Sequence, residues 1–323
     1  MRAFGPVPSR RLGRSLGVNH IPPKVCTYAC VYCQVGRTTE MRVERRRFYD
    51  PDEIVRDVRA KVQQAAAAGT AAAAGIDYIC FVPDGEPTLD IHLGDEIEQL
   101  KPLGIPIGVI TNGSLLWRQD VRAELMQADW VSCKVDAVRE PAWRTVDRPR
   151  GSLRLAGLLD GVLAFARVYG GTLVTETMLV GGVNDGAEEV RETAAFLARL
   201  RPATAYLSIP TRPPAEAWVR PPDEAALNRA YQILSEQVPA VEYLIGYEGN
   251  AFASTGDLQS DLLSIIAVHP MREDAVQAFL ERAGANGSAV QTLIEQGALV
   301  ETAYGGHTFY VRPTSRRHAH AQA

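Results

Sequence analysis

Apolar runs alternate with amphipathic stretches along the chain from about residue 15 to residue 247. The near-continuous apolar runs predict buried strands, and the stretches with a helical period between them predict helices. Strands are expected at residues 15–21, 76–82, 106–111, 130–136, 172–180, 204–210 and 241–247. Helices are expected at residues 52–68, 92–102, 118–128, 154–169, 186–200 and 223–237.

This alternation predicts an α/β fold built on a parallel sheet. Six strands precede the run at 241–247, which suits a partial parallel (β/α)6 barrel better than a complete eight-stranded barrel. We expect the barrel, with the segment that leads into it, to occupy residues 1–255.

The pattern changes near Gly256, where short helical stretches precede two strand-like runs joined at Gly305–Gly306. Two glycines between such runs predict a hairpin. The order of elements predicts a small winged-helix-like domain over residues 256–313, followed by a disordered tail at 314–323. Its last helix offers Gln291 and Glu295 but no Lys or Arg, so we expect protein packing or docking and no DNA reading.

The bulk composition is that of an ordinary globular protein, with 46% hydrophobic and 22% charged residues among 323. No apolar run is long enough for a transmembrane helix, and the first residues lack the pattern of a signal peptide. We therefore expect a cytoplasmic protein with reduced thiols and no membrane contact.

The charge is unevenly distributed although the net charge is only −4. Residues 1–47 contain ten Lys or Arg and two Glu, a local charge of +8. Such a basic segment would attract a phosphate-rich ligand, such as a nucleic acid. The alternative is a solvated surface whose arginines pair with acids elsewhere.

Three of the five cysteines, Cys26, Cys30 and Cys33, lie within eight positions. Three thiolates from one loop suffice for three irons of a [4Fe–4S] cluster and leave the fourth iron open. A zinc site would want a fourth ligand, for which His20 is the only close imidazole, and a disulfide would leave one thiol over. Cys80 and Cys133 lie in apolar strands and are expected to be small core residues.

The stretch CTYACVYC resembles the motif of the radical SAM superfamily, three cysteines spaced by three and two residues with an aromatic before the last. The resemblance implies that Cys26, Cys30 and Cys33 hold a [4Fe–4S] cluster and that S-adenosylmethionine (SAM) chelates its open iron. It also implies reductive cleavage of SAM to a 5′-deoxyadenosyl radical that abstracts a hydrogen atom from substrate. Tyr32 would lie near the adenine, and a flavodoxin or ferredoxin would supply the electron.

Further SAM contacts are expected at the ends of the next three strands. The stretch DGEPT resembles the Gly-Gly-Glu-Pro motif of the family with Asp84 in place of the first glycine, so Gly85, Glu86 and Pro87 are expected beside the SAM ammonium. In TNGS, Asn112 either reaches a ribose hydroxyl or only forms a turn. On the strand at 130–136, Ser132, Lys134 and Asp136 share one face. Ser132 and Lys134 would bind the SAM carboxylate, unless Lys134 and Asp136 form a buried ion pair without ligand.

Weaker substrate candidates follow later strands: Glu176, Arg212, Glu248 and Asn250. The longer text from about residue 4 to 270 resembles a branch related to the synthases that make the tricyclic wyosine base of tRNA. Those enzymes are expected to carry a second cluster, but this chain has no cysteine before Cys26. The competing hypotheses are a glycyl-radical-activase-like enzyme that acts on a protein and a non-catalytic iron–sulfur protein.

Overall fold

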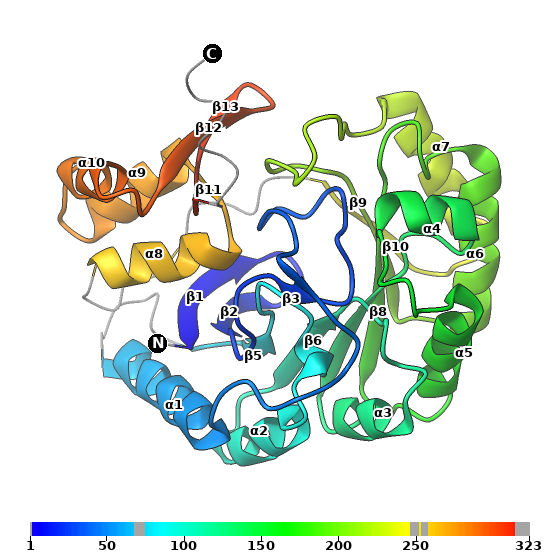
Figure 1. Cartoon of the computed structure of the whole chain (residues 1–323), viewed down its shortest axis with the longest axis horizontal. Helices are drawn as coiled ribbons and strands as arrows, with labels where there is room; N and C mark the ends of the chain where they lie inside the picture. The colour runs from blue at the N-terminus through cyan, green and yellow to red at the C-terminus, as the bar shows by residue number, and fades with distance from the viewer. Residues whose placement is uncertain (1, 68–74, 246–251, 253–257, 314–323) are drawn as a thin grey trace.

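One eight-stranded sheet dominates the computed structural model, which describes residues 2–67, 75–245, 252 and 258–313 (Figure 1). The strand order is β1-β2-β5-β6-β7-β8-β9-β10, and every neighbouring pair from β2 to β10 is parallel. The parallel strands are β2 (Gly13–Val18), β5 (Tyr78–Phe81), β6 (Ile107–Thr111), β7 (Trp130–Lys134), β8 (Thr172–Met178), β9 (Thr204–Ser208) and β10 (Val241–Leu244).

All seven predicted strands are present, and the expected parallel α/β architecture is confirmed. The barrel was expected to use six of these strands, but β10 joins the same sheet as a seventh parallel strand. In addition, β1 (Ala3–Ser9) forms an antiparallel edge that the pattern did not predict. Its sequence, AFGPVPS, contains two prolines and a glycine, which interrupt an apolar run. Prolines are tolerated there because an edge strand needs fewer ladder hydrogen bonds.

Helices form an outer ring around this sheet (Figure 1). They are α1 (Pro51–Ala67), α2 (Leu93–Leu100), α3 (Gln119–Leu125), α4 (Glu140–Val146), α5 (Leu155–Ala166), α6 (Ala187–Leu200) and α7 (Glu224–Ser235), with short 3-10 turns at Pro87–Leu89 and Lys101–Leu103. Alternate strand residues such as Ile79, Phe81 and Val131 are fully buried in the main core with apolar residues of these helices. Of these seven helices, only α4 has no counterpart among the predicted ranges.

The opposite face of the strands lines the inside of the barrel. Leu12, Cys80, Trp130 and Val174 form a separate buried cluster there. Because Trp130, Ser132 and Lys134 alternate with outward residues, the polar pair lies on this same inner face, further toward the carboxyl end of β7. The Arg10 guanidinium, in the β1–β2 turn, donates to the Leu244 carbonyl at 3.0 Å and links the two ends of the sheet.

The C-terminal module, residues 258–313, has its own core around Phe279 and Leu293. It comprises α8 (Leu258–Val268), β11 (Met271–Arg272), α9 (Glu273–Arg282), α10 (Ser288–Glu295), β12 (Val300–Tyr304) and β13 (His307–Val311). Its three strands are antiparallel in the order β11-β13-β12, and the predicted hairpin turns at Gly305–Gly306, both with positive φ. This order is compatible with a winged-helix-like domain, which stays a prediction, as do the domain boundaries. The expected disordered tail, residues 314–323, lies outside the described residues.

The C-terminal module packs on the barrel beside β1 and α1 (Figure 1). Lys61 of α1 and Asp261 of α8 form an ion pair at 2.8 Å in which both side chains are only 2% exposed. Tyr304 donates to the Pro210 carbonyl after β9 at 2.9 Å. The module therefore contacts both the helical ring and a segment at the carboxyl ends of the strands.

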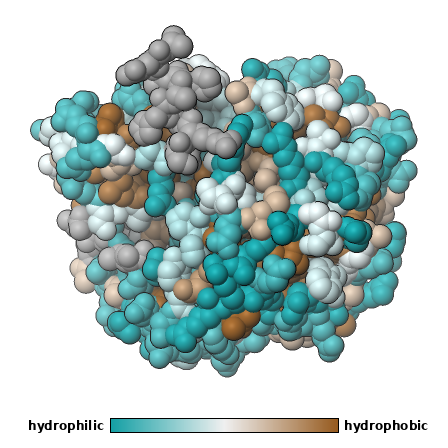
Figure 2. Space-filling model, in the orientation of Figure 1, coloured by the Kyte–Doolittle hydropathy of each residue, from teal (hydrophilic) through white to brown (hydrophobic). Residues whose placement is uncertain are grey.

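The face of the molecule shown in Figure 2 is mainly hydrophilic, with scattered apolar side chains. Among the described residues, the large exposed apolar side chains include Trp117, Val168 and Trp218, which come from different segments. Single exposed apolar residues are normal on globular proteins. In the part of the chain that the structure describes, no helix is long and apolar enough to cross a bilayer.

Candidate active site

The three predicted iron ligands lie on the cysteine loop, residues 24–39, between β2 and the two-residue strand β4 (Glu40–Met41). Cys26 ends β3 (Val25–Cys26), which pairs with β4. The Cys33 amide donates to the Cys30 carbonyl at 3.1 Å, so a tight turn connects the last two ligands. The loop leaves the carboxyl end of β2, where parallel α/β folds bind their ligands.

A strap, residues 146–150 at the end of α4, holds the cysteine loop from one side. The amides of Ala29 and Val31 donate to the carbonyls of Asp147 and Val146 at 3.0 and 2.9 Å. The strap residue Arg148 has a φ of 45°, in the left-handed region that non-glycine residues rarely adopt. The sequence pattern gave no sign of this contact, because the paired segments lie far apart along the chain.

Each of the three thiols has a polar neighbour. The Asn112 amide lies 3.6 Å from the Cys26 sulfur, the Cys30 thiol donates to Asp147 at 3.4 Å, and the Lys24 ammonium donates to the Cys33 sulfur at 3.1 Å. Burial raises the pKa of the Cys26 thiol to about 12 and that of Cys30 well above its ordinary value. Thiolates for metal ligation therefore need compensating positive charge, which bound iron supplies.

The donor set fits a [4Fe–4S] cluster. All five cysteines are free thiols, and three of them share one loop with a buried ammonium beside it. In the described ranges no three His, Cys, Asp or Glu side chains form a group that could hold a single metal ion. A cubane takes one thiolate per iron and does not require its ligands to meet at one point.

Gly85 lies directly against the cysteine loop. A Cβ at Gly85 would lie 2.2 Å from the Val25 carbonyl oxygen, and the amide of Glu86 donates to that oxygen at 3.1 Å. Only glycine allows the two backbones to approach this closely. The Gly-Glu-Pro segment and the cysteine loop are thus packed together, as the expected SAM site requires.

The Glu86 carboxylate is engaged within the protein. It is 1% exposed and accepts from the amide and hydroxyl of Thr88, the hydroxyl of Thr111 and the amide of Asn112, at 2.6–3.1 Å. Despite these donors, burial raises the pKa of Glu86. Three of these bonds reach Oε1 and one reaches Oε2, so Glu86 joins its own turn to the end of β6. Its direct contact with SAM stays a prediction.

Asp84, the departure from the family motif, has partners of its own. Asn19 donates to its carboxylate at 3.1 Å, and Arg312 of the C-terminal module lies 3.6 Å away. The Asp84 carbonyl accepts from the Lys24 amide at 2.7 Å. The segment expected to hold SAM is therefore linked to both the cysteine loop and the C-terminal module.

Lys134 lies inside the barrel between two carboxylates, Asp136 at 3.2 Å and Glu176 at 3.1 Å. Burial disfavours its charge, but the two carboxylates together raise its pKa above the ordinary value. Burial likewise opposes ionisation of Glu176, yet Lys134 and Arg11 lower its pKa to about 2. The buried ion pair between Lys134 and Asp136, the alternative to a SAM contact, is thus present.

Arg11, which the sequence did not single out, enters the barrel from the β1–β2 turn. Its guanidinium donates to Ser132 at 3.0 Å and to Glu176 at 2.8 Å. The expected pair for the SAM carboxylate, Ser132 and Lys134, is therefore part of a charged network that Arg11 completes.

Tyr32 connects this network to the cysteine loop. Its hydroxyl donates to Asp136, and the Lys134 ammonium lies 4.8 Å from its ring centre. Burial and the nearby Asp136 raise the pKa of Asp147, the neighbour of Cys30, well above its ordinary value. Asp136 and Asp147 thus join an expected iron ligand to the barrel interior, and neither role was visible in the sequence.

The remaining candidates differ in placement. Arg212 donates to Gln34, which follows Cys33, at 2.7 Å and contacts His269 of the C-terminal module at 2.9 Å. Cys80 and Cys133 are 1% and 0% exposed, as small core residues are. Glu248 and Asn250 lie outside the described residues.

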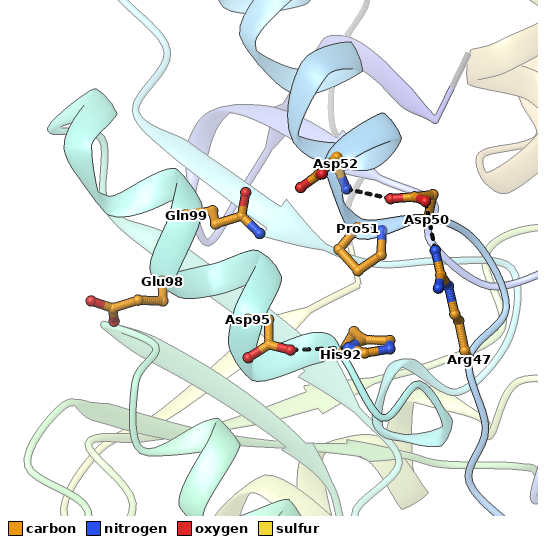
Figure 3. A pocket seen from close by; sticks show the side chains of 8 residues that line it. All are labelled: Arg47, Asp50, Pro51, Asp52, His92, Asp95, Glu98 and Gln99. Carbon is orange, nitrogen blue, oxygen red and sulfur yellow. Dashed lines mark hydrogen bonds and ion pairs between the residues drawn. The ribbon is translucent and has the colours of Figure 1, made fainter.

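Most arginines of the basic N-terminal segment have acidic partners. The ion pairs are Arg11–Glu176, Arg14–Asp77, Arg37–Glu216, Arg42–Glu40, Arg45 with Asp120 and Glu124, Arg46–Glu40 and Arg47–Asp50. Figure 3 shows the last of these in a surface hollow formed by the start of α1 and by side chains along α2. None of the expected cluster or SAM residues lines this hollow. These pairs favour the solvated-surface alternative for most of the segment.

Comparison with known proteins identifies the family to which the chain belongs. The family model described as the radical SAM superfamily matches residues 21–197, which is more than half of the chain. The chain belongs to the radical SAM superfamily. It is also 42% identical to the UPF0026 protein MJ1312 of Methanocaldococcus jannaschii over 98% of this chain and 97% of that protein.

Solved radical SAM structures share the fold. A radical SAM methyltransferase from Sphaerobacter thermophilus superposes with a TM-score of 0.53 at 20% identity, covering 73% of this chain and 69% of that chain. TYW1 with a lysine-pyruvate adduct superposes with a TM-score of 0.50 at 16% identity, covering 70% of this chain and 74% of that chain. Membership of this superfamily makes the chain an enzyme that uses a [4Fe–4S] cluster and SAM.

Proposed function

We propose that Cys26, Cys30 and Cys33 hold the [4Fe–4S] cluster and that the protein abstracts a hydrogen atom from a phosphate-bearing substrate. When bound, the cluster supplies the electron that cleaves SAM reductively to a 5′-deoxyadenosyl radical. The observation that carries the proposal is the packing of the cysteine loop on Gly85, which brings the expected cluster and SAM segments together.

Different residues of the chain would bind different parts of SAM. The Gly85 segment would accept the SAM ammonium through backbone oxygens, since the Glu86 carboxylate is occupied. Ser132 and Lys134 would orient the SAM carboxylate. Tyr32, held by Asp136, would border the adenine.

The substrate class rests on charge beside the cysteine loop. Arg37 and Arg148 are 54% and 42% exposed and share one carboxylate, Glu216, which leaves the group with a net positive charge. We propose that this group attracts a phosphate of a tRNA or of a phosphorylated metabolite. Arg42 and Arg46 share Glu40 in the same way, so the choice rests on position: Arg37 lies on the cysteine loop and Arg148 lies on the strap that holds it.

Anaerobic reconstitution with iron and sulfide, followed by dithionite and SAM, tests the proposal. We expect release of 5′-deoxyadenosine. Deuterium transfer into that product from labelled tRNA or metabolite pools would identify the substrate class, whereas transfer from a protein would indicate an activase. A cluster that binds but never cleaves SAM would favour a non-catalytic iron–sulfur protein.

A further inference from the structure

Lysine is rare in this chain, and most of its lysines are not on the surface. Of 34 basic residues only four are lysines, at positions 24, 61, 101 and 134. Lys101 is exposed and pairs with Glu98, as a surface lysine usually does. The side chains of Lys61 and Lys134 are 2% and 14% exposed, and Lys24 as a whole residue is 7% exposed. A buried ammonium needs a negative partner because desolvation of an isolated charge is very costly.

Two of the three buried lysines have such partners. Lys61 pairs with Asp261 at 2.8 Å, and Lys134 lies between Asp136 and Glu176. Lys24 is different, because its ammonium donates to the thiol of Cys33 at 3.1 Å. Among the residues that the structure describes, no carboxylate forms an ion pair with Lys24.

The nearest acid does not fill this role. Asp84 is close enough for its pKa to respond to the Lys24 charge, but its carboxylate contacts Asn19 and Arg312. A neutral thiol offers the ammonium only a weak acceptor. The protein as folded therefore places a cation where a negative charge is still required.

The backbone conformation of Lys24 orients its side chain. Lys24 has a φ of 62°, in the left-handed region that residues with a side chain rarely adopt. Its amide donates to Asp84 and its carbonyl accepts from Thr39 and Glu40, so the conformation is fixed from both sides. Glycine would adopt it without strain, which indicates that the lysine side chain has a use.

We infer that Lys24 is the counter-charge of the thiolate-bound cluster and raises its reduction potential. The inference rests on the proposed function and names a positioning residue of that same site. Three ligating thiolates on the same loop would provide the missing negative charge, with that of Cys33 in contact with the ammonium. One-electron reduction adds a further negative charge, so a cation beside a ligating sulfur favours the reduced form.

The test compares wild type with Lys24→Met, which removes the charge at similar length, and Lys24→Arg, which keeps it. Lys101→Met is the control for loss of a surface lysine. Each protein is reconstituted anaerobically, assayed for iron and sulfide, and titrated with dithionite in the presence of redox dyes. At a fixed potential we expect the ratio of reduced to oxidised cluster to fall at least tenfold in Lys24→Met, equivalent to about 59 mV. Lys24→Arg should restore most of the shift.

Each unexpected result of these measurements has its own interpretation. An unchanged potential in Lys24→Met would overturn the inference, and a tenfold weaker binding of SAM in the same variant would assign the ammonium to the SAM carboxylate instead. If Lys24→Met folds by circular dichroism but loses iron, recovery of iron in Lys24→Arg supports the charge role and its absence overturns it. A wild-type protein that holds no iron or sulfide would overturn the proposed function itself.

Discussion

The side-chain amide of Asn112 lies 3.6 Å from the sulfur of Cys26, although the residues are 86 positions apart. The same amide donates to Thr27 at 2.8 Å, and the Asn112 backbone amide donates to Glu86 at 2.8 Å. The end of β6 therefore joins the cysteine loop to the Gly85 segment. The ribose contact expected for Asn112 stays a prediction, but the residue already has a role in arranging the expected site.

Cys30→Ala should abolish SAM cleavage and most iron binding, because two thiolates cannot hold three irons of a cubane. Iron and sulfide content and 5′-deoxyadenosine release measure the effect. Cys133→Ala is the matched control, since that thiol is buried outside the loop and should leave both quantities unchanged. A Cys30→Ala protein with full iron content and activity would contradict the ligand assignment.

Gly85→Ala should displace the cysteine loop, because the added methyl would lie 2.2 Å from the Val25 carbonyl. We expect at least a severalfold loss of iron after reconstitution, together with a lower midpoint of thermal unfolding. Gly157→Ala, in α5, has no atom within 4 Å of the new methyl and should have little effect on either measurement. Equal iron content in the two variants would show that this close approach is not needed for the site.

Lys134→Ala should weaken SAM binding at least tenfold while iron content stays unchanged. The ammonium has three donors, and Asp136 and Glu176 leave one for a carboxylate of SAM. Equilibrium binding of SAM to the reconstituted protein measures the effect, with Lys101→Ala as control. An unaltered dissociation constant would limit Lys134 to its internal ion pairs.

Glu96→Gln should stabilise the protein above neutral pH. Glu96 is fully buried, both carboxylate oxygens lack a hydrogen-bond partner, and burial with three nearby acids raises its pKa from 4.5 to about 9. Since the folded state prefers the protonated acid, its stability is complete below about pH 4.5 and declines as pH rises toward 9. We expect a gain of about 2 kcal/mol or more at pH 8, from a shift worth about 1.4 kcal/mol per unit.

Urea unfolding at pH 5 and pH 8 checks this expectation. The advantage of Glu96→Gln should be small at pH 5 and large at pH 8. Glu98→Gln, two residues away with a side chain 66% exposed, should show no such dependence. A pH-independent difference would show that the Glu96 carboxyl is hydrated in the folded protein.

Asp261→Ala should destabilise the chain by about 3–5 kcal/mol, because it leaves the Lys61 ammonium buried without its carboxylate. The double variant Lys61→Met/Asp261→Ala should recover most of the loss. Chemical unfolding of the wild type, Lys61→Met, Asp261→Ala and the double variant completes a double-mutant cycle. Additive effects would indicate that the two side chains do not interact across α1 and α8 in solution.

The sequence pattern was sufficient for the parallel strands because their apolar runs are local signals. It missed α4, whose stretch EPAWRTV is seven residues long and carries a proline. The cysteine spacing likewise predicted the cluster loop, and the Gly-Glu-Pro and Ser-x-Lys segments predicted neighbouring strand ends. Lys24, Arg11 and Asp147 were not found, since their roles depend on contacts with residues that only folding brings near.

The hydrogen bond from Tyr304 to the Pro210 carbonyl spans 94 positions and joins the last hairpin to the segment after β9. During synthesis, that hairpin leaves the ribosome later than every strand of the barrel. The barrel strands emerge earlier, so a nascent barrel must wait for its final contact at this edge. Iron and sulfide delivered to the nascent chain would therefore reach the cysteine loop before the last hairpin has packed against the segment after β9.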